Sequence, residues 1–264
     1  MTSKAYKGGR IYTVTLGDIE YIGYFEADKE NEEIKSAKKR ITSLRGRSPD
    51  FLMNAELFDF ITRRAASDVV AAGKTVRLTE GYGFAFPENK TVVFSYKNNV
   101  NAPDYVGAYP TLVRNGAEET QNPAGITGRR GRTALGLSDG ELYIALIPDK
   151  TGTTLSELRK RFIALGVKNA INLDGGGSTQ FYAPDGNFFS GRRVRGFIGI
   201  WVSGGDRRRV NVRTSLNVRS GPGIFHKRIG RMYNGDIVRV EEERGAWCRV
   251  ANGWLHSDYL SKIK

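Results

Sequence analysis

The chain has 264 residues, 39% hydrophobic and 11% aromatic, which is enough apolar side chain for one large or two ordinary domains and excludes wholesale disorder. Its only cysteine, Cys248, excludes a disulfide framework, and the Cys/His spacings of zinc sites are absent. The formal net charge is +13, and residues 206–264 alone hold 13 Lys/Arg and 6 Asp/Glu. A basic surface of this kind attracts polyanions such as nucleic acid, anionic lipid or the phosphate-rich polymers of bacterial walls.

No apolar run approaches the length of a membrane span, so no membrane span is expected. The N-terminal residues lack the apolar core of a secretory signal. We therefore expect synthesis in the cytoplasm without a signal peptide.

The first 100 residues alternate between strand and helix patterns. Residues 10–25 are rich in β-branched and aromatic side chains and predict two short strands. Apolar residues recur at helical spacing over residues 34–44, which predicts an amphipathic helix ending near Gly46. An apolar strand over residues 51–58 runs into polar side chains, and residues 74–100 are typical of further strands.

A stronger pattern follows in the middle of the chain. Residues 132–137 and 142–147 predict two strands joined by a Ser-Asp-Gly turn. Thr154 and Glu157 have the spacing of a capping box that opens a helix, and a buried strand follows at residues 170–173. The strand–helix–strand order indicates a crossover onto one sheet.

The last quarter of the chain has a different composition. After a strand at residues 196–202, residues 203–209 read Ser-Gly-Gly-Asp-Arg-Arg-Arg and predict a linker. Residues 210–264 contain short strands separated by Gly-rich turns, which is typical of a small β-barrel.

The Gly-rich stretch of residues 172–179 carries the candidate chemistry. It reads Asn-Leu-Asp-Gly-Gly-Gly-Ser-Thr and follows the predicted buried strand, so Asp174 is expected at the rim of a sheet, where ligand sites collect. Three glycines allow close approach of a ligand, and their successive amides can form an anion-binding nest. A tight loop that binds nothing is the alternative.

With the preceding Gly-Arg-Thr-Ala-Leu-Gly of residues 131–136, this stretch resembles the phosphodiester glycosidase family, which includes the N-acetylglucosamine-1-phosphodiester α-N-acetylglucosaminidase that uncovers mannose 6-phosphate. Three more segments resemble family motifs in the family's order, namely residues 54–58, 110–116 and 154–158. Together they cover most of residues 1–205. Ala55-Glu56 departs from the small glycine pair usual there, and the substrate is therefore not inherited.

The resemblance implies cleavage between a sugar anomeric carbon and a phosphodiester oxygen. The leaving phosphate needs positive charge and N–H donors. Arg132, with Arg192 or Arg195, is expected to clamp it. The oxocarbenium-like sugar needs a carboxylate, for which Asp174 is the first candidate and Glu56 the second. Asn54 is expected to bind the sugar or orient the carboxylate, and the remaining predicted substrate-binding residues are Asn172, Gly175, Gly176, Gly177, Ser178 and Thr179.

Each candidate has a structural alternative. Arg132 could be a surface cation or an ion-pair partner, and Asp174 could only cap its loop. Glu56 could be a solvated carboxylate, and the run from Arg192 to Arg195 a wet surface. No cofactor or metal is expected from the spacing of Asp, Glu and His, although a divalent cation near Asp174 is not excluded.

Residues 216–260 closely resemble a bacterial SH3 domain, above all in the opening Leu-Asn-Val-Arg-Ser-Gly-Pro. The resemblance implies binding of cell-wall glycan or peptide through residues 210–264; a structural or dimerisation role is the alternative. Trp247 and Trp254 are expected to fill its small core. The predicted fold class is α+β: a mixed β-sheet catalytic domain with packed helices over residues 1–205, then a small all-β SH3-like barrel within residues 206–264, linker included.

The leading functional hypothesis is a hydrolase of glycosyl phosphodiesters in a bacterial wall or surface polymer, with an architecture that resembles a phage lysin and acts at the wall after release. A cytoplasmic enzyme on a soluble sugar phosphodiester and a non-catalytic wall-binding protein are the alternatives. A nucleic-acid binder is not supported, because no helix-turn-helix or aromatic RNA-binding pattern accompanies the charge.

Overall fold

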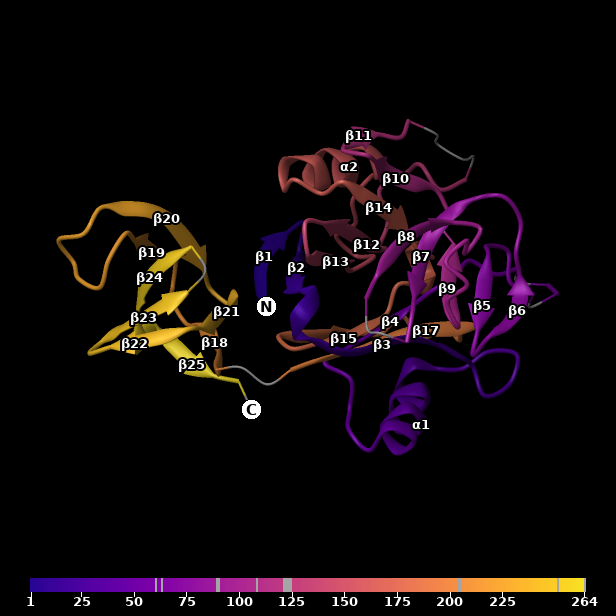
Figure 1. The fold of residues 1–264 in the computed structure, drawn as a ribbon, viewed down its shortest axis with the longest axis horizontal. Helices are drawn as coiled ribbons and strands as arrows, with labels where there is room; N and C mark the ends of the chain where they lie inside the picture. The colour runs from indigo at the N-terminus through magenta and orange to yellow at the C-terminus, as the bar shows by residue number, and fades with distance from the viewer. Residues whose placement is uncertain are drawn as a thin grey trace.

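Two antiparallel sheets packed face to face, each covered outside by one helix, form the larger part of the computed structural model (Figure 1). The structure describes residues 1–263 except 60, 63, 89, 90, 108, 121–124, 204, 205 and 251. No helix in this described part is long and apolar enough to cross a membrane.

The first sheet has seven strands in the order β1-β2-β13-β12-β14-β10-β11. Their bounds are β1 Thr2–Tyr6, β2 Gly9–Thr15, β10 Thr111–Arg114, β11 Ala117–Glu118, β12 Arg132–Ser138, β13 Glu141–Ile147 and β14 Asn169–Asn172. Helix α2 (Leu155–Ala164) covers its outer face through Leu155, Leu158 and Phe162.

The second sheet has the order β16-β15-β4-β17-β3, and a third sheet, β6-β5-β9-β7-β8, contacts it along β3. The bounds are β3 Ile19–Glu26, β4 Phe51–Asn54, β5 Val69–Ala71, β6 Lys74–Arg77, β7 Tyr82–Phe86, β8 Val93–Tyr96, β9 Asp104–Gly107, β15 Phe181–Ala183, β16 Gly186–Phe188 and β17 Gly196–Val202. Helix α1 (Ile34–Arg45) packs on the outer face through Ile34, Ala37 and Ile41. Short 3₁₀ turns are η1 Leu16–Asp18, η2 Gly176–Ser178 and η3 Ser257–Tyr259.

The expected local patterns are confirmed at α1 and α2. Helix α1 ends at Gly46, whose φ of 71° is the left-handed conformation of a helix C-cap. At the start of α2, Thr154 accepts a hydrogen bond from the Glu157 amide and Glu157 accepts one from the Thr154 amide, so the capping box is present. The two-residue turn between β12 and β13 uses Asp139 and Gly140, both with positive φ.

The α+β class is confirmed, with one correction to the sheet. All strand pairings in the described residues are antiparallel, whereas a mixed sheet was expected. The crossover through α2 does join two parallel strands, β13 and β14, but β12 lies between them and pairs antiparallel with both. The two strands expected over residues 10–25 exist as β2 and β3, and they belong to different sheets.

The C-terminal unit is all-β, as expected. Its sheets have the orders β21-β18-β25 and β20-β19-β24-β23-β22. The bounds are β18 Asp206–Val210, β19 Ser215–Arg219, β20 Arg228–Tyr233, β21 Ile237–Val240, β22 Glu242–Arg244, β23 Trp247–Val250, β24 Gly253–His256 and β25 Leu260–Lys262. The linker prediction is wrong for residues 206–209, because Arg208 is buried and the backbone of this segment pairs with β21 and β25. Residues 204 and 205 of the predicted linker lie outside the described residues.

A buried polar interface holds the two units together. Arg10 forms ion pairs with Asp185 of the larger unit and with Asp236 of the C-terminal unit, the latter at 2.7 Å. The Ile237 amide donates to Ser3 Oγ at 3.0 Å, and the Ile237 side chain is buried in the main core. The C-terminal unit is therefore packed against β1 and β2, beside which Figure 1 shows it.

Candidate active site

The Gly-rich loop after β14 lies at the rim where the two main sheets meet. Asn54, at the end of β4, holds it there. Its Nδ2 donates to the Asp174 carbonyl at 2.7 Å, and its Oδ1 accepts from Thr133 Oγ1 and from the Gln180 amide. Asn54 is fully buried, so these bonds replace its contacts with water. Of its two predicted roles, the geometry supports orienting Asp174.

The three glycines bring side chains and backbone close together. Gly176 has φ of 57°, and its amide donates to the Gly131 carbonyl at 2.9 Å. The Gly175 amide donates to Asp174 Oδ1 at 2.8 Å. Two of the three amides expected to bind an anion are therefore used inside the protein, and the predicted nest is wrong at those positions. A Cβ on Gly177 would lie 2.8 Å from Arg192 Nη2, so this glycine makes room for the guanidinium.

Asp174 has the properties of a functional carboxylate. Burial raises its pKa to about 6, against the lowering effects of a Ser178 hydrogen bond, the Gly175 amide and the charge of Arg192. Arg192 Nη1 donates to Ser178 Oγ at 3.1 Å. The structure therefore brings Asp174 and Arg192 together in one cavity wall.

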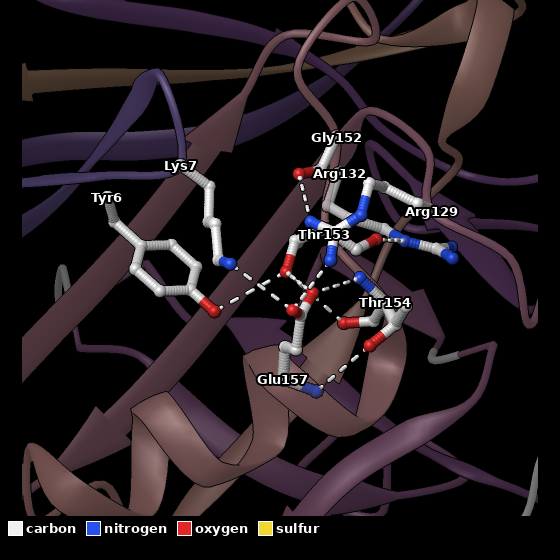
Figure 2. A network of polar contacts seen from close by, with 8 residues as sticks. All are labelled: Tyr6, Lys7, Arg129, Arg132, Gly152, Thr153, Thr154 and Glu157. Atoms are coloured by element: carbon white, nitrogen blue, oxygen red, sulfur yellow. Dashed lines mark hydrogen bonds and ion pairs between the residues drawn. The ribbon is translucent and has the colours of Figure 1, made fainter.

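Arg132 is buried, with 1% of its surface exposed, and forms part of the wall of the site. Its Nε donates to the Thr153 carbonyl at 3.2 Å and its Nη2 to the Gly128 carbonyl at 2.9 Å. Figure 2 shows the Thr153 contact beside Glu157, the acid of the capping box. Hydrogen bonds from the Thr154 amide, then Arg129, hold the pKa of Glu157 well below its usual range. Arg132 thus bonds to carbonyls, and neither the surface-cation nor the ion-pair alternative describes it.

Burial and the neighbouring charge of Arg130 lower the pKa of Arg132 to about 10. Arg130 was missed by sequence reasoning. A Cβ built on Gly176 would lie 3.8 Å from its Nη1, and its exposed side chain forms no hydrogen bond or ion pair with another described residue. Its position in the printed sequence, directly before the family-like Gly131-Arg132, is the one signal that could have found it.

Glu56 and Arg195 lie behind Asp174. Glu56 is fully buried; its Oε1 accepts from Tyr24 Oη at 2.8 Å and lies 3.8 Å from Arg195 Nε. Its Oε2 has no hydrogen-bond partner among the described residues. Burial raises its pKa to about 7, and the charge of Asp174 acts in the same direction. The solvated-carboxylate alternative is wrong, and Arg195, which also pairs with Glu26, does not line the cavity beside Asp174.

The remaining predicted residues are buried in the loop. Asn172 Nδ2 donates to the Tyr109 and Leu173 carbonyls, and its Oδ1 has no partner among the described residues. Thr179 Oγ1 is likewise buried without a partner among them. Asn172 also contributes to the wall of the cavity beside Asp174.

These residues line one cavity of about 290 Å³. Its wall contains Asp174, the three glycines, Asn172, Arg130, Arg132 and Arg192. It lies at the lower end of the range of small-molecule sites, roughly 300–1,000 Å³. One carboxylate and three arginines in a single cavity wall suit a ligand that is anionic at one end and develops positive charge at the other. Within the described residues, no three His, Cys, Asp or Glu side chains gather as metal ligands.

Comparison with known proteins gives two family matches. Residues 50–211 match the model described as phosphodiester glycosidase, and residues 214–261 match the bacterial SH3 domain. Among solved structures, the chain is similar to the zebrafish N-acetylglucosamine-1-phosphodiester α-N-acetylglucosaminidase catalytic domain, auto-inhibited by its pro-peptide. The identity is 20%, the TM-score 0.56, and the match covers 73% of this chain and 76% of that one.

A hypothetical protein from Synechocystis is similar at 13% identity and a TM-score of 0.57, over 76% of this chain and 61% of that one. At these identities both structures show a shared fold. No curated protein matches the chain.

Proposed function

The chain belongs to the phosphodiester glycosidase family, and from that premise we propose that it hydrolyses the bond between a sugar anomeric carbon and a phosphodiester oxygen. The observation that carries the proposal is the cavity whose wall holds Asp174 together with Arg130, Arg132 and Arg192. The guanidiniums hold the phosphate, and the carboxylate faces the sugar.

The proposed step balances with water as the only co-reactant. The water oxygen ends on the anomeric carbon as a hydroxyl, and the bond from that carbon to the bridging oxygen breaks. The phosphate monoester leaves with the bridging oxygen, and the second proton of the water passes to the monoester or to solvent. Arg192 and Arg130 offset the charge that develops on the phosphate. Asp174, ionised above a pKa of about 6, stabilises the oxocarbenium-like sugar as nucleophile or as base for water.

Sugar release from an α-N-acetylglucosamine phosphodiester tests the reaction class. Asp174→Asn should lower kcat at least 100-fold, and Arg192→Gln at least tenfold, in the range of lost acid–base and electrostatic groups. Arg193→Gln is the matched control, because Arg193 is exposed and its Nε donates to Asn31 Oδ1. Its rate should stay within threefold of wild type. Full activity of Asp174→Asn would refute the proposed carboxylate.

The polymer and the place of action belong to the same proposal. A basic bacterial SH3 domain beside a glycosidase of this family supports a substrate in a bacterial wall or surface polymer. Action at the wall after release, as in a phage lysin, remains a prediction. Sedimentation of the full chain with purified walls tests it: the soluble-substrate alternative predicts that the protein stays in the supernatant.

A further inference from the structure

The C-terminal unit has a groove of its own, far in sequence from Asp174. Its volume is about 790 Å³. Its lining includes Trp247 of β23, His256 of β24 and Tyr259 of η3, together with Arg213 and Arg219. We call these five residues the ring groove.

The three rings form a continuous row. The centroids of Trp247 and His256 are 5.1 Å apart, and those of His256 and Tyr259 are 5.8 Å apart, both pairs edge to face. Trp254 is buried, as expected for a core residue, but Trp247 is half-buried, so its expected core role is wrong in part. Half-exposed rings in a row offer apolar faces on which the C–H faces of sugar rings can pack.

The charges of the groove favour an anion. Arg213 is exposed and forms no hydrogen bond or ion pair with another described residue. Arg219 donates through Nη1 to the His226 carbonyl at 2.9 Å and also lines the groove. Asp258 is the one carboxylate in the described wall of the groove. Guanidinium groups bind phosphate as planar, two-pronged donors.

We propose that the ring groove is a second binding site for the same class of polymer, taking a sugar ring on Trp247, His256 and Tyr259 and an adjoining phosphate on Arg213 and Arg219. This assignment rests on the proposed function, because the occupant is the polymer that the first site cuts. The C-terminal unit is packed against the larger unit through Arg10 and Ile237. The ring groove therefore holds the polymer while the other site acts, which raises its local concentration.

Fluorine NMR on the full chain tests the site. The protein contains three tryptophans, so 5-fluorotryptophan labelling gives three signals, assigned with Trp→Phe variants. All samples carry Asp174→Asn, which prevents hydrolysis of the probe. The probe is an oligomer of N-acetylglucosamine 1-phosphate, compared with neutral chitotetraose and with a peptidoglycan stem peptide. The oligomer should shift the Trp247 signal. The concentration of oligomer at half of the full shift should be lower than that of chitotetraose or of the stem peptide.

Two variants in the groove and one matched control give the residue assignment. Arg213→Gln should weaken binding seen at the Trp247 signal about tenfold, the loss of one charge-assisted contact. Tyr259→Ala should weaken it about fivefold, in the range of one lost stacking contact. Arg228→Gln removes the same charge from an exposed position outside the groove and should change it less than twofold.

The proposal is overturned if the oligomer leaves the Trp247 signal unmoved, or if Arg213→Gln binds like Arg228→Gln. Stronger binding of the stem peptide would assign the groove to peptide and also overturn it. Sugar release is measured separately on the chain with Asp174 intact. Binding without hydrolysis there would refute the proposed reaction and leave the second site standing.

Discussion

Replacing Glu56 by Gln should change how the stability of the protein depends on pH. Burial raises the pKa of Glu56 from 4.5 to about 7, so between these values the folded state binds a proton that the unfolded state has lost. The folded protein therefore loses stability as pH rises from about 4.5 to 7. A shift of this size corresponds to about 3 kcal/mol. Glu56→Gln has no charge to bury and should escape that loss.

Urea unfolding of wild type and Glu56→Gln at pH 4 and pH 8 measures the effect. The variant should gain about 3 kcal/mol relative to wild type between the two pH values. Glu20→Gln, at an exposed ion pair with Arg47, is the control and should change by less than about 0.5 kcal/mol. A stability difference between Glu56→Gln and wild type that is the same at both pH values would refute a raised pKa of the buried Glu56 carboxyl.

Three more outcomes follow from the contacts. Arg10→Ala leaves the buried carboxylates of Asp185 and Asp236 without this cation and should lower the free energy of unfolding, measured by calorimetry, by about 3–5 kcal/mol. Lys168→Ala, at an exposed ion pair, is the control and should lower it by less than about 1 kcal/mol. Equal losses would contradict the buried interface. Gly177→Ala should displace Arg192 and lower sugar release at least tenfold while the melting temperature changes little; unchanged release would place that guanidinium outside the reaction. The rate of sugar release should rise as pH increases through about 6, where Asp174 ionises, and a rate that falls there would exclude an ionised Asp174.

Local signals in the sequence predict much of the fold because they depend on near neighbours. The capping box at Thr154 and Glu157 and the left-handed cap at Gly46 are each set within one turn of chain. Strand β1 was not predicted, because its five residues show no clear alternation and its place depends on β2 and β21. The Arg-rich segment from Asp206 was predicted as a linker because its place in the sheet also depends on residues distant in the chain. Buried Arg208, for example, forms an ion pair with Glu243 as well as with the nearby Asp206.

The same contrast between local signals and contacts of distant residues applies to the candidate site. The order of the family-like motifs predicts Asn54, Arg132 and Asp174 as site residues, and the structure places them around the Gly-rich loop after β14. The direction of each side chain could not be predicted, because it depends on packing between distant segments. Arg195, close to Arg192 in the chain, pairs with Glu26 and Glu56 and does not line the cavity.

Isotope tracing in ¹⁸O-labelled water tests directly which bond is broken. Attack at the anomeric carbon leaves the bridging oxygen on the phosphate, so the released phosphate monoester should contain no ¹⁸O by ³¹P NMR. Asp174→Asn should form this monoester at least 100-fold more slowly. One ¹⁸O in each released phosphate would show attack at phosphorus and would contradict the proposed glycosidase reaction.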